Sequence, residues 1–225
     1  YLRFDNFIFL KRNEEKSGYH TYLWRIAKGS HMTLFPNMNV NDPVWRKLLR
    51  DVGFRRALSL GINRHELNQV IYFGLALEAQ NTVLPDSPLF RKDYQKAWSR
   101  FDIETANKLL DELGLDKRDD RDIRLLPDGR PLEIIVESTG ESTEEADVLE
   151  LVTDSWRQIG IKLHTKPSQR EVMRNRIYAG ETVMSISSGL ENGVPSADMD
   201  PKGLAPTGQV QYQWPKWGQH YESIG

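Results

Sequence analysis

The chain has 225 residues, and its 39% hydrophobic and 28% charged residues are typical of a globular protein. Its 30 Lys and Arg stand against 32 Asp and Glu, which argues against a nucleic-acid-binding protein, because that class shows a basic excess or stripe. Cys is absent, so disulfides, thiolate chemistry and Cys-ligated metals are excluded. No apolar run approaches the roughly 20 residues of a membrane-spanning helix.

The first 32 residues carry few structural signals. The chain opens without Met and without the pattern of a secretory signal peptide, so we expect a fragment of a longer protein. Residues 20–26 (HTYLWRI) show no helical period and are predicted to form a strand. Residues 29–32 (GSHM) are similar to a cloning scar, but a scar usually lies at a terminus, so we interpret them as native sequence.

Two helices meeting at a corner are predicted between residues 43 and 74. A strand over 33–40, broken by Pro36, comes first, and a turn at 41–43 follows it. Apolar residues then recur at helical spacing up to Ile62. Asn63 opens a second helix, because its side chain can cap the N–H of Glu66 while Glu66 reaches back to the N–H of Asn63. Gly74 suits a left-handed helix stop.

Residues 75–100 form a long connection containing two Pro, and a loop of this length is often functional. Asp102 is predicted to cap the next helix, which ends at Gly114. We expect four of the six Trp to pack in or near the core: Trp24, Trp45, Trp98 and Trp156.

A β-α-β-α-β series is the clearest pattern in the chain. Strands are predicted at 132–136, 161–165 and 182–187. Capping boxes at Ser142 and Ser168 open the two intervening helices, and Gly160 and Gly180 end them. Such a series predicts parallel pairing with right-handed crossovers, in an α/β fold whose sheet is flanked by helices.

From residue 189 onwards the sequence has no period and is rich in Gly and Pro. It leaves the carboxyl end of a strand, which is the edge where open α/β sheets bind ligands. Carboxylates and indoles in this segment predict a cleft for an amine-bearing or sugar ligand. An ordinary surface loop with Trp side chains filling the core is the alternative. The candidate ligand-binding residues are Glu191, Asn192, Asp198, Asp200 and Trp214.

Other chemical sites have little support in the sequence. The five His are scattered without metal-ligand spacing, and no phosphate loop, dinucleotide fingerprint or nucleophile elbow is present, so neither metal nor cofactor is predicted. Four acids near the start of one helix are interpreted as a solvated face favoured by the helix dipole. These are Glu144, Glu145, Asp147 and Glu150.

The stretch 54–85 (FRRALSLGINRHELNQVIYFGLALEAQNTVLP) resembles a segment of family 5 extracytoplasmic solute-binding proteins, the oligopeptide/dipeptide class of ABC importers. Its family pattern is Arg-x-Ala-hydrophobic-x-x-Ala-Ile-Asp-Arg. The chain matches it at Arg56, Ala57, Leu58, Ile62 and Arg64, with Gly61 for the usual Ala and Asn63 for the usual Asp. The segments FDIETANKLLDELGL and 132–165 follow in family order, so the resemblance covers roughly 33–217.

This resemblance implies a lobe of a type II periplasmic-binding fold. Residues 1–32 would lead in from a hinge and a first lobe, 33–188 would form the second lobe, and 189–225 would be an irregular cleft-side return. In several peptide binders an Asp after the last strand of this lobe holds the amino terminus of the ligand, and Asp198, Asp200 and Glu191 occupy about that place.

The implied function is capture of a peptide-like solute between two lobes, for delivery to the transmembrane permease subunits of an ABC importer. The parent protein would be periplasmic or otherwise extracytoplasmic, monomeric and not an enzyme. Other solutes remain open, because some members of the family bind oligosaccharides, nickel or opines. Two alternatives from other classes are an interaction domain and a hydrolase using paired carboxylates among Glu191, Asp198 and Asp200.

Overall fold

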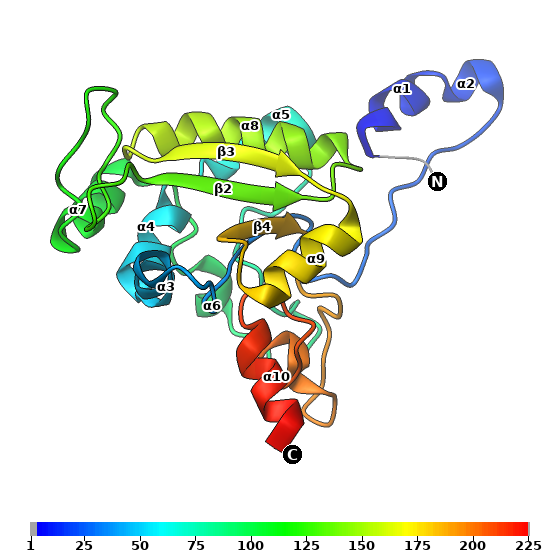
Figure 1. Ribbon diagram of the computed structural model, residues 1–225. Helices are drawn as coiled ribbons and strands as arrows, with labels where there is room; N and C mark the ends of the chain where they lie inside the picture. The colour runs from blue at the N-terminus through cyan, green and yellow to red at the C-terminus, as the bar shows by residue number, and fades with distance from the viewer. Residues whose placement is uncertain (1–3, 225) are drawn as a thin grey trace.

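The computed structural model describes residues 4–224 (Figure 1). The four strands are β1 (Thr33–Pro36), β2 (Glu133–Ser138), β3 (Lys162–Pro167) and β4 (Met184–Ser187). The α-helices are α1 (Phe7–Arg12), α2 (Glu14–Ser17), α3 (Pro43–Arg50), α4 (Val52–Leu60), α5 (Arg64–Tyr72), α6 (Lys92–Lys96), α7 (Ile103–Glu112), α8 (Thr143–Arg157), α9 (Arg170–Ala179) and α10 (Pro215–Ile224). Two short 3₁₀ helices cover Phe4–Asn6 and Pro201–Gly203.

The strands form one mixed sheet in the order β1-β4-β2-β3. β2 is parallel to both β3 and β4, whereas β1 is antiparallel to β4. The predicted β-α-β-α-β series is therefore confirmed, with α8 and α9 as the crossovers. Together with the flanking helices, this confirms the predicted α/β class with a mixed or parallel sheet.

Helices cover both faces of the sheet. Ile134 and Val136 of β2 are buried in the core together with Leu149 and Trp156 of α8. Alternate residues of a strand point to opposite faces. Glu137 accordingly lies on the other face, where Arg176 of α9 pairs with it at 3.0 Å. Thus α8 and α9 lie on opposite faces of the sheet.

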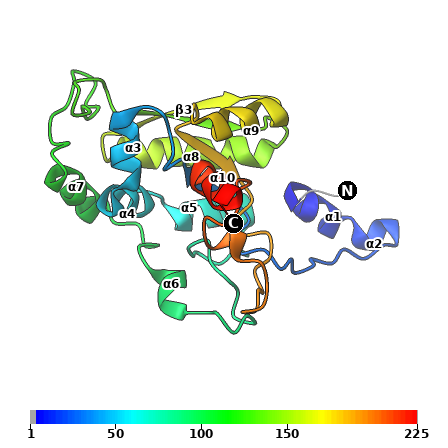
Figure 2. The same ribbon diagram turned by 60° about the horizontal axis from the view of Figure 1, so that its bottom comes forward.

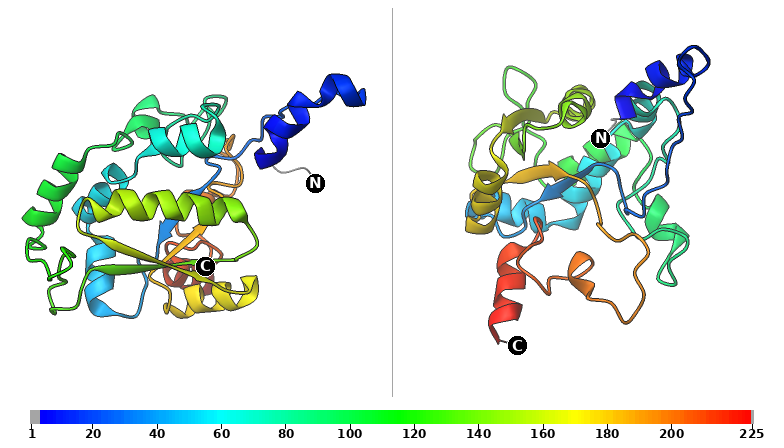
Figure 3. Two further views of the ribbon diagram at one scale, coloured as in Figure 1. Left: turned by 90° about the horizontal axis from the view of Figure 1, so that it is seen from above. Right: turned by 90° about the vertical axis from the view of Figure 1, so that its right-hand side faces the viewer.

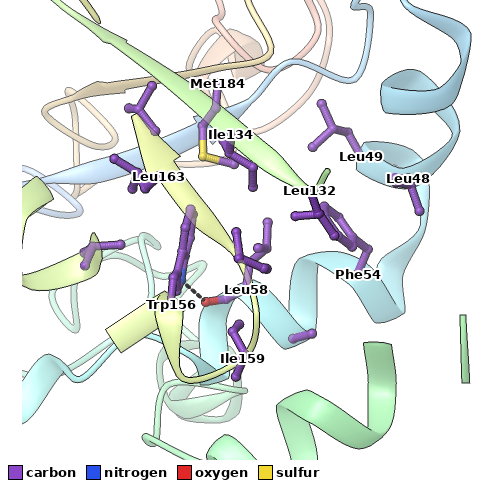
Figure 4. Close-up of a cluster of buried hydrophobic side chains, with 14 of the residues drawn as sticks. Leu48, Leu49, Phe54, Leu58, Leu132, Ile134, Trp156, Ile159, Leu163 and Met184 are labelled. Atoms are coloured by element: carbon purple, nitrogen blue, oxygen red, sulfur yellow. Dashed lines mark hydrogen bonds between the residues drawn. The ribbon is translucent and has the colours of Figure 1, made fainter. Parts of the chain in front are cut away.

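The core extends from the sheet into the helix pair α3–α4 (Figure 4). Trp156 is fully buried, and its Nε1 donates to the Leu58 carbonyl across 3.0 Å, which fixes α8 against α4. Gly61 lies at a close approach, because a Cβ there would come within 2.7 Å of Ile159 Cδ1. A residue without a side chain therefore allows α4 to end directly against α8.

The corner between α4 and α5 forms as predicted. Asn63 accepts the backbone N–H of Glu66 at 3.2 Å. The return half of the capping box is wrong in detail, because Glu66 bonds to the side-chain amide of Asn63 instead of its backbone N–H. Asp102 and Ser142 cap α7 and α8 as expected.

Three local predictions are wrong. Residues 20–26 form no strand; within the described chain they run as an exposed, irregular segment. Trp24 is consequently 87% exposed, and Trp98 is also exposed, whereas Trp45 and Trp156 are buried. Ser168 does not cap α9: its N–H donates to the Ser138 carbonyl, and Gln169 precedes the helix without a side-chain cap.

At both ends, the described chain extends beyond the layered body. Helices α1 and α2 extend away from the sheet (Figures 1 and 3). The segment after β4 descends on another side and ends in α10. Residues 29–32 belong to the fold, since Met32 packs against the core and His31 pairs with Glu144. No described helix combines the length and apolar character needed to cross a membrane.

Candidate functional site

Three loops meet at one edge of the sheet. β2 and β4 are parallel, so their carboxyl ends lie at the same edge, and the antiparallel β1 begins there with Thr33 opposite Ser187. Residues 27–33, 81–87 and 188–195 converge at this place, which we call the carboxyl edge. It is where ligands bind in open α/β sheets.

Backbone hydrogen bonds join these loops. The N–H of Gly29 donates to the Leu190 carbonyl at 2.8 Å, and the N–H of Gly189 donates to the Ser30 carbonyl at 3.0 Å. The side-chain amide oxygen of Asn81 accepts the N–H of Leu190 at 2.9 Å. The long connection 75–100 therefore runs beside the segment after β4 (Figure 2).

A charged group lies at the point where the chain leaves β4. Lys28 Nζ is 3.3 Å from Glu191 Oε1 and donates to Ser188 Oγ at 3.2 Å. Ser188 Oγ also donates to Glu191 Oε1 at 3.2 Å. The Glu191 side chain is 79% exposed, so its carboxylate is accessible to a ligand. At the start of β1, opposite Ser187, Thr33 Oγ1 is buried without a hydrogen-bond partner among the described residues.

The other two predicted acids, Asp198 and Asp200, accept hydrogen bonds from residues in their own loop. Asp198 accepts a hydrogen bond from the Ser196 hydroxyl, which holds the pKa of this fully exposed carboxyl below its ordinary value. Asp200 caps the 3₁₀ helix at Pro201–Gly203 by accepting the N–H of Lys202 at 3.0 Å. Neither acid is joined by a hydrogen bond or ion pair to Glu191.

Asn192 directly follows Glu191 but is not hydrogen-bonded to it, and Trp214 belongs to the segment before α10. The Asn192 side chain accepts the N–H of Val194 at 3.0 Å and so shapes the turn after β4. Trp214 directly precedes α10, and its Nε1 is buried without a partner within residues 4–224. The structure thus brings Glu191 and Asn192 to the carboxyl edge but does not gather all five predicted residues.

A second polar cluster at this edge was missed by the sequence interpretation. Glu144 Oε1 lies 2.9 Å from His31 Nε2 and accepts the Tyr72 hydroxyl at 2.7 Å. The imidazole also meets the Tyr72 ring edge-on at 5.5 Å between centroids. The interpretation of Glu144 as part of a solvated helix face is therefore wrong, because it joins α8 to α5 and to the segment before β1.

The three side chains of this cluster shift one another's pKa values. The hydrogen bond to Glu144 raises the pKa of His31, even though burial works in the opposite direction. Burial works to raise the pKa of Glu144, but hydrogen bonds from His31 and Tyr72 hold that pKa below its ordinary value. Burial, followed by the contact with Glu144, raises the pKa of Tyr72. The cluster therefore favours a charged His31–Glu144 pair.

The neighbouring Glu145 also departs from the predicted solvated face. Its side chain is buried, and burial raises the pKa of its carboxyl. Its Oε2 has no hydrogen-bond partner in the described structure. Over the same residues, no group of three or more His, Asp and Glu side chains is placed to hold a metal ion.

Comparison with known proteins identifies the family. A profile of "Bacterial extracellular solute-binding proteins, family 5 Middle" matches residues 6–209. The chain is 27% identical over 173 residues to the dipeptide-binding protein of Escherichia coli K12, which covers 75% of this chain and 30% of that protein. The oligopeptide-binding protein OppA superposes with a TM-score of 0.74 at 38% identity, over 84% of this chain and 29% of OppA.

The fold is shared more widely. The periplasmic binding protein MelB from Agrobacterium fabrum, solved with stachyose, superposes with a TM-score of 0.74 at 15% identity, over 96% of this chain and 34% of MelB. Its identity is low, so this likeness concerns the type II periplasmic-binding fold alone. The chain spans about a third or less of the length of these relatives. The family match over most of the chain leads to one conclusion: this chain belongs to the family 5 bacterial extracellular solute-binding proteins.

Proposed function

We propose that this chain supplies one lobe of the substrate-binding component of an ABC importer. The lobe captures a peptide-like solute at the carboxyl edge and closes over it against a second lobe. The loaded protein then delivers the solute to the transmembrane permease subunits. Support comes from the family and from two relatives named as dipeptide- and oligopeptide-binding proteins. On the same grounds we propose that the protein acts outside the cytoplasm, and we expect it to be a monomer.

The accessible Glu191 carboxylate is the observation that carries the proposed peptide site. Asp198 and Asp200 are engaged within their own loop, whereas Glu191 faces Lys28 across 3.3 Å. An exposed ion pair contributes little stability, so the ammonium of a peptide's amino terminus can displace that of Lys28 at small cost. Glu191 is therefore the proposed partner of the ligand amine, with Ser188 and Asn192 beside it.

The exposed segment 19–28 fits the proposed hinge side of the lobe. Tyr22, Leu23, Trp24 and Ile26 are exposed, although they are the apolar residues that a strand would bury. We place residues 1–32 as the lead-in from the first lobe, 33–188 as the second lobe and 189–225 as the cleft-side return. Closure of two lobes about such a hinge buries the solute between them.

Melting curves in the presence of candidate solutes test the solute class. A ligand at 100 times its Kd adds about 2.7 kcal/mol, and for a chain of this size about 1 kcal/mol shifts the melting temperature by roughly 2–4 °C. We expect di- and tripeptides to shift the melting of a protein that carries both lobes by several degrees, and that of the 225-residue chain by much less. A shift with oligosaccharides or nickel alone would leave the family intact and overturn the peptide proposal.

Two other functions have weaker support. A hydrolase using paired carboxylates needs one acid with a raised pKa, whereas the pKa of Asp198 is lowered. An interaction domain would show an apolar surface without a polar site, but the carboxyl edge carries both Lys28 and Glu191. Membership in a solute-binding family favours the importer proposal over both.

A further inference from the structure

The outer edge of β3 is unpaired in the described part of the chain. β3 is the last strand in the sheet order, and no described segment pairs with its other side (Figure 1). The N–H of Lys162 donates to the Leu132 carbonyl, and that of Ser168 to the Ser138 carbonyl, so the even-numbered residues face β2. In a parallel ladder, the residues between them point both their N–H and their C=O away from the partner strand. The N–H and C=O groups of Leu163 and Thr165 are therefore free to pair with an added strand.

A groove runs beside this open edge. It has a volume of about 660 Å³, and it lies between β3 and α8. Leu163 and Thr165 line its strand side, Glu150 and Asp154 line its helix side, and Ser138 lies at one end. The free backbone groups of β3 thus border a hollow that an extended chain can occupy.

Ser138 is an unpaired polar group at the end of this groove. The residue is only 7% exposed, and no hydrogen bond joins its hydroxyl to another described residue. Because Ser138 lines the groove, a polar group of an occupant can provide the missing bond.

The helix side of the groove is acidic. Glu150 and Asp154 lie one helical turn apart on α8, and neither forms an ion pair with any described residue. Like charges at this spacing destabilise a helix slightly. The groove lining contains no Lys or Arg. A cationic side chain between the two carboxylates would therefore relieve their repulsion.

We propose that the β3 edge and its groove bind an extended segment of a partner protein. The segment adds as a strand to β3 and places a Lys or Arg side chain between Glu150 and Asp154. Backbone pairing at Leu163 and Thr165 supplies the register, as in other cases of strand addition. This site lies two strands away from β4 and its carboxylate at Glu191.

The occupant is neither a second copy of the chain nor a free peptide. Antiparallel self-pairing through Leu163 and Thr165 would place Lys162 opposite Lys166 of the second copy, and like charges in that position are destabilising. Lysines on an edge strand commonly prevent such self-pairing. A free peptide would bring a terminal carboxylate into a groove that offers it no Lys or Arg.

NMR titration of the isotopically labelled 225-residue chain tests this proposal. The probe is the capped peptide acetyl-Thr-Val-Lys-Val-Thr-amide, which has no charged terminus. We expect it to shift the amide signals of Leu163, Thr165, Glu150 and Asp154. The same peptide with Glu for Lys should bind about fivefold more weakly, as expected for surface charge pairs, and so should the version with a free carboxyl terminus.

Two variants separate the backbone and charge contributions. Thr165→Pro removes one outward N–H, and an edge strand tolerates Pro, so binding should be lost while the fold persists. Glu150→Gln with Asp154→Asn should abolish the preference for Lys over Glu. The matched control, Glu104→Gln with Glu171→Gln, removes two exposed helix carboxylates elsewhere and should leave the preference unchanged.

Other outcomes would overturn the proposal. Equal binding of the Lys and Glu peptides, or unchanged binding by Thr165→Pro, would contradict the β3 site. Concentration-dependent dimerisation lost in Thr165→Pro would assign the edge to a second copy. Shifts confined to residues 188–193 would place the peptide at the carboxyl edge, which contradicts this inference and leaves the proposed importer function standing.

Discussion

The layered body at 33–187 and the segments that flank it differ in what determines their structure. In the body, periodic apolar residues and capping side chains specify strands and helices that bury one another. In the flanks, residues 19–31 and 188–214 are irregular apart from one 3₁₀ turn, and expose large apolar side chains. Two tryptophans show this difference: Trp156 in the body is fully buried, whereas Trp24 in the amino-terminal flank is 87% exposed.

The difference shows where stability and function reside. The body stabilises itself through local signals and packing. The flanks hold the carboxyl edge together through contacts between residues far apart in sequence, such as Lys28 with Glu191. We therefore expect substitutions in the body to change stability, and substitutions at the carboxyl edge to change binding.

The largest expected effect is the loss of a core side chain. Trp156→Ala removes a fully buried indole and its hydrogen bond to Leu58, and should lower the free energy of unfolding by about 3–5 kcal/mol. Trp24→Ala should change it by no more than about 0.5 kcal/mol, because that side chain is exposed. Urea unfolding of both variants measures the difference. Similar losses for the two would mean that the amino-terminal segment packs against the body in solution.

A smaller effect is expected from the loss of a helix cap. Asn63→Ala should cost about 0.5–2 kcal/mol, because the N–H of Glu66 loses its acceptor. Ser168→Ala is the matched control: the sequence predicts a cap at Ser168, whereas the structure shows none. Thermal melting compares the two variants. An equal loss of stability in Ser168→Ala would mean that Ser168 caps α9 after all. An unchanged melting temperature in Asn63→Ala would mean that Asn63 does not cap α5.

The smallest expected effect is the pH dependence of the His31–Glu144 pair. The pKa of His31 is raised in the folded state, so its contribution to stability is present below the unfolded pKa of about 6.5 and is lost as pH rises through the folded value. The lowered pKa of Glu144 gives a contribution that is lost as pH falls through that value. The pair therefore stabilises the fold most in mildly acidic solution.

NMR titration of the imidazole checks this assignment. The His31 pKa should lie above 6.5 in the wild-type chain and fall in Glu144→Gln. The stability difference between the two proteins should shrink from pH 6 to pH 8. Glu66→Gln, on the exposed surface of α5, should leave the titration of His31 unchanged. An ordinary His31 pKa in the wild type would mean that the pair does not form in solution.

Sequence patterns predicted the body well because its determinants are local. The apolar run containing Ile134 marked β2, and Gly180 marked the end of α9 with a φ of +79°. Ser168 failed as a cap because its N–H continues the β3 ladder by donating to Ser138, which delays the start of the helix by one residue. That competition depends on a neighbouring strand, so sequence spacing could not reveal it.

The candidate site was only partly predictable. The rule that ligands bind at the carboxyl ends of parallel strands led to Glu191 and Asn192. Lys28 and His31 were missed because their partners, Glu191 and Glu144, lie more than 100 residues away along the chain. The only available signal was that they precede the strand at Thr33, and nothing local indicates that this strand lies beside β4.

The most direct test of the account is the contribution of Glu191 to binding a free amino terminus. NMR titration of the 225-residue chain with Ala-Ala-Ala and with its N-acetylated form measures the preference for the charged amine. We predict a preference of about fivefold or more in the wild type, its loss in Glu191→Gln, and its retention in Asp200→Asn. An unchanged preference in Glu191→Gln, or no shifts at residues 188–193 with either peptide, would contradict the assignment of the carboxyl edge as the solute site.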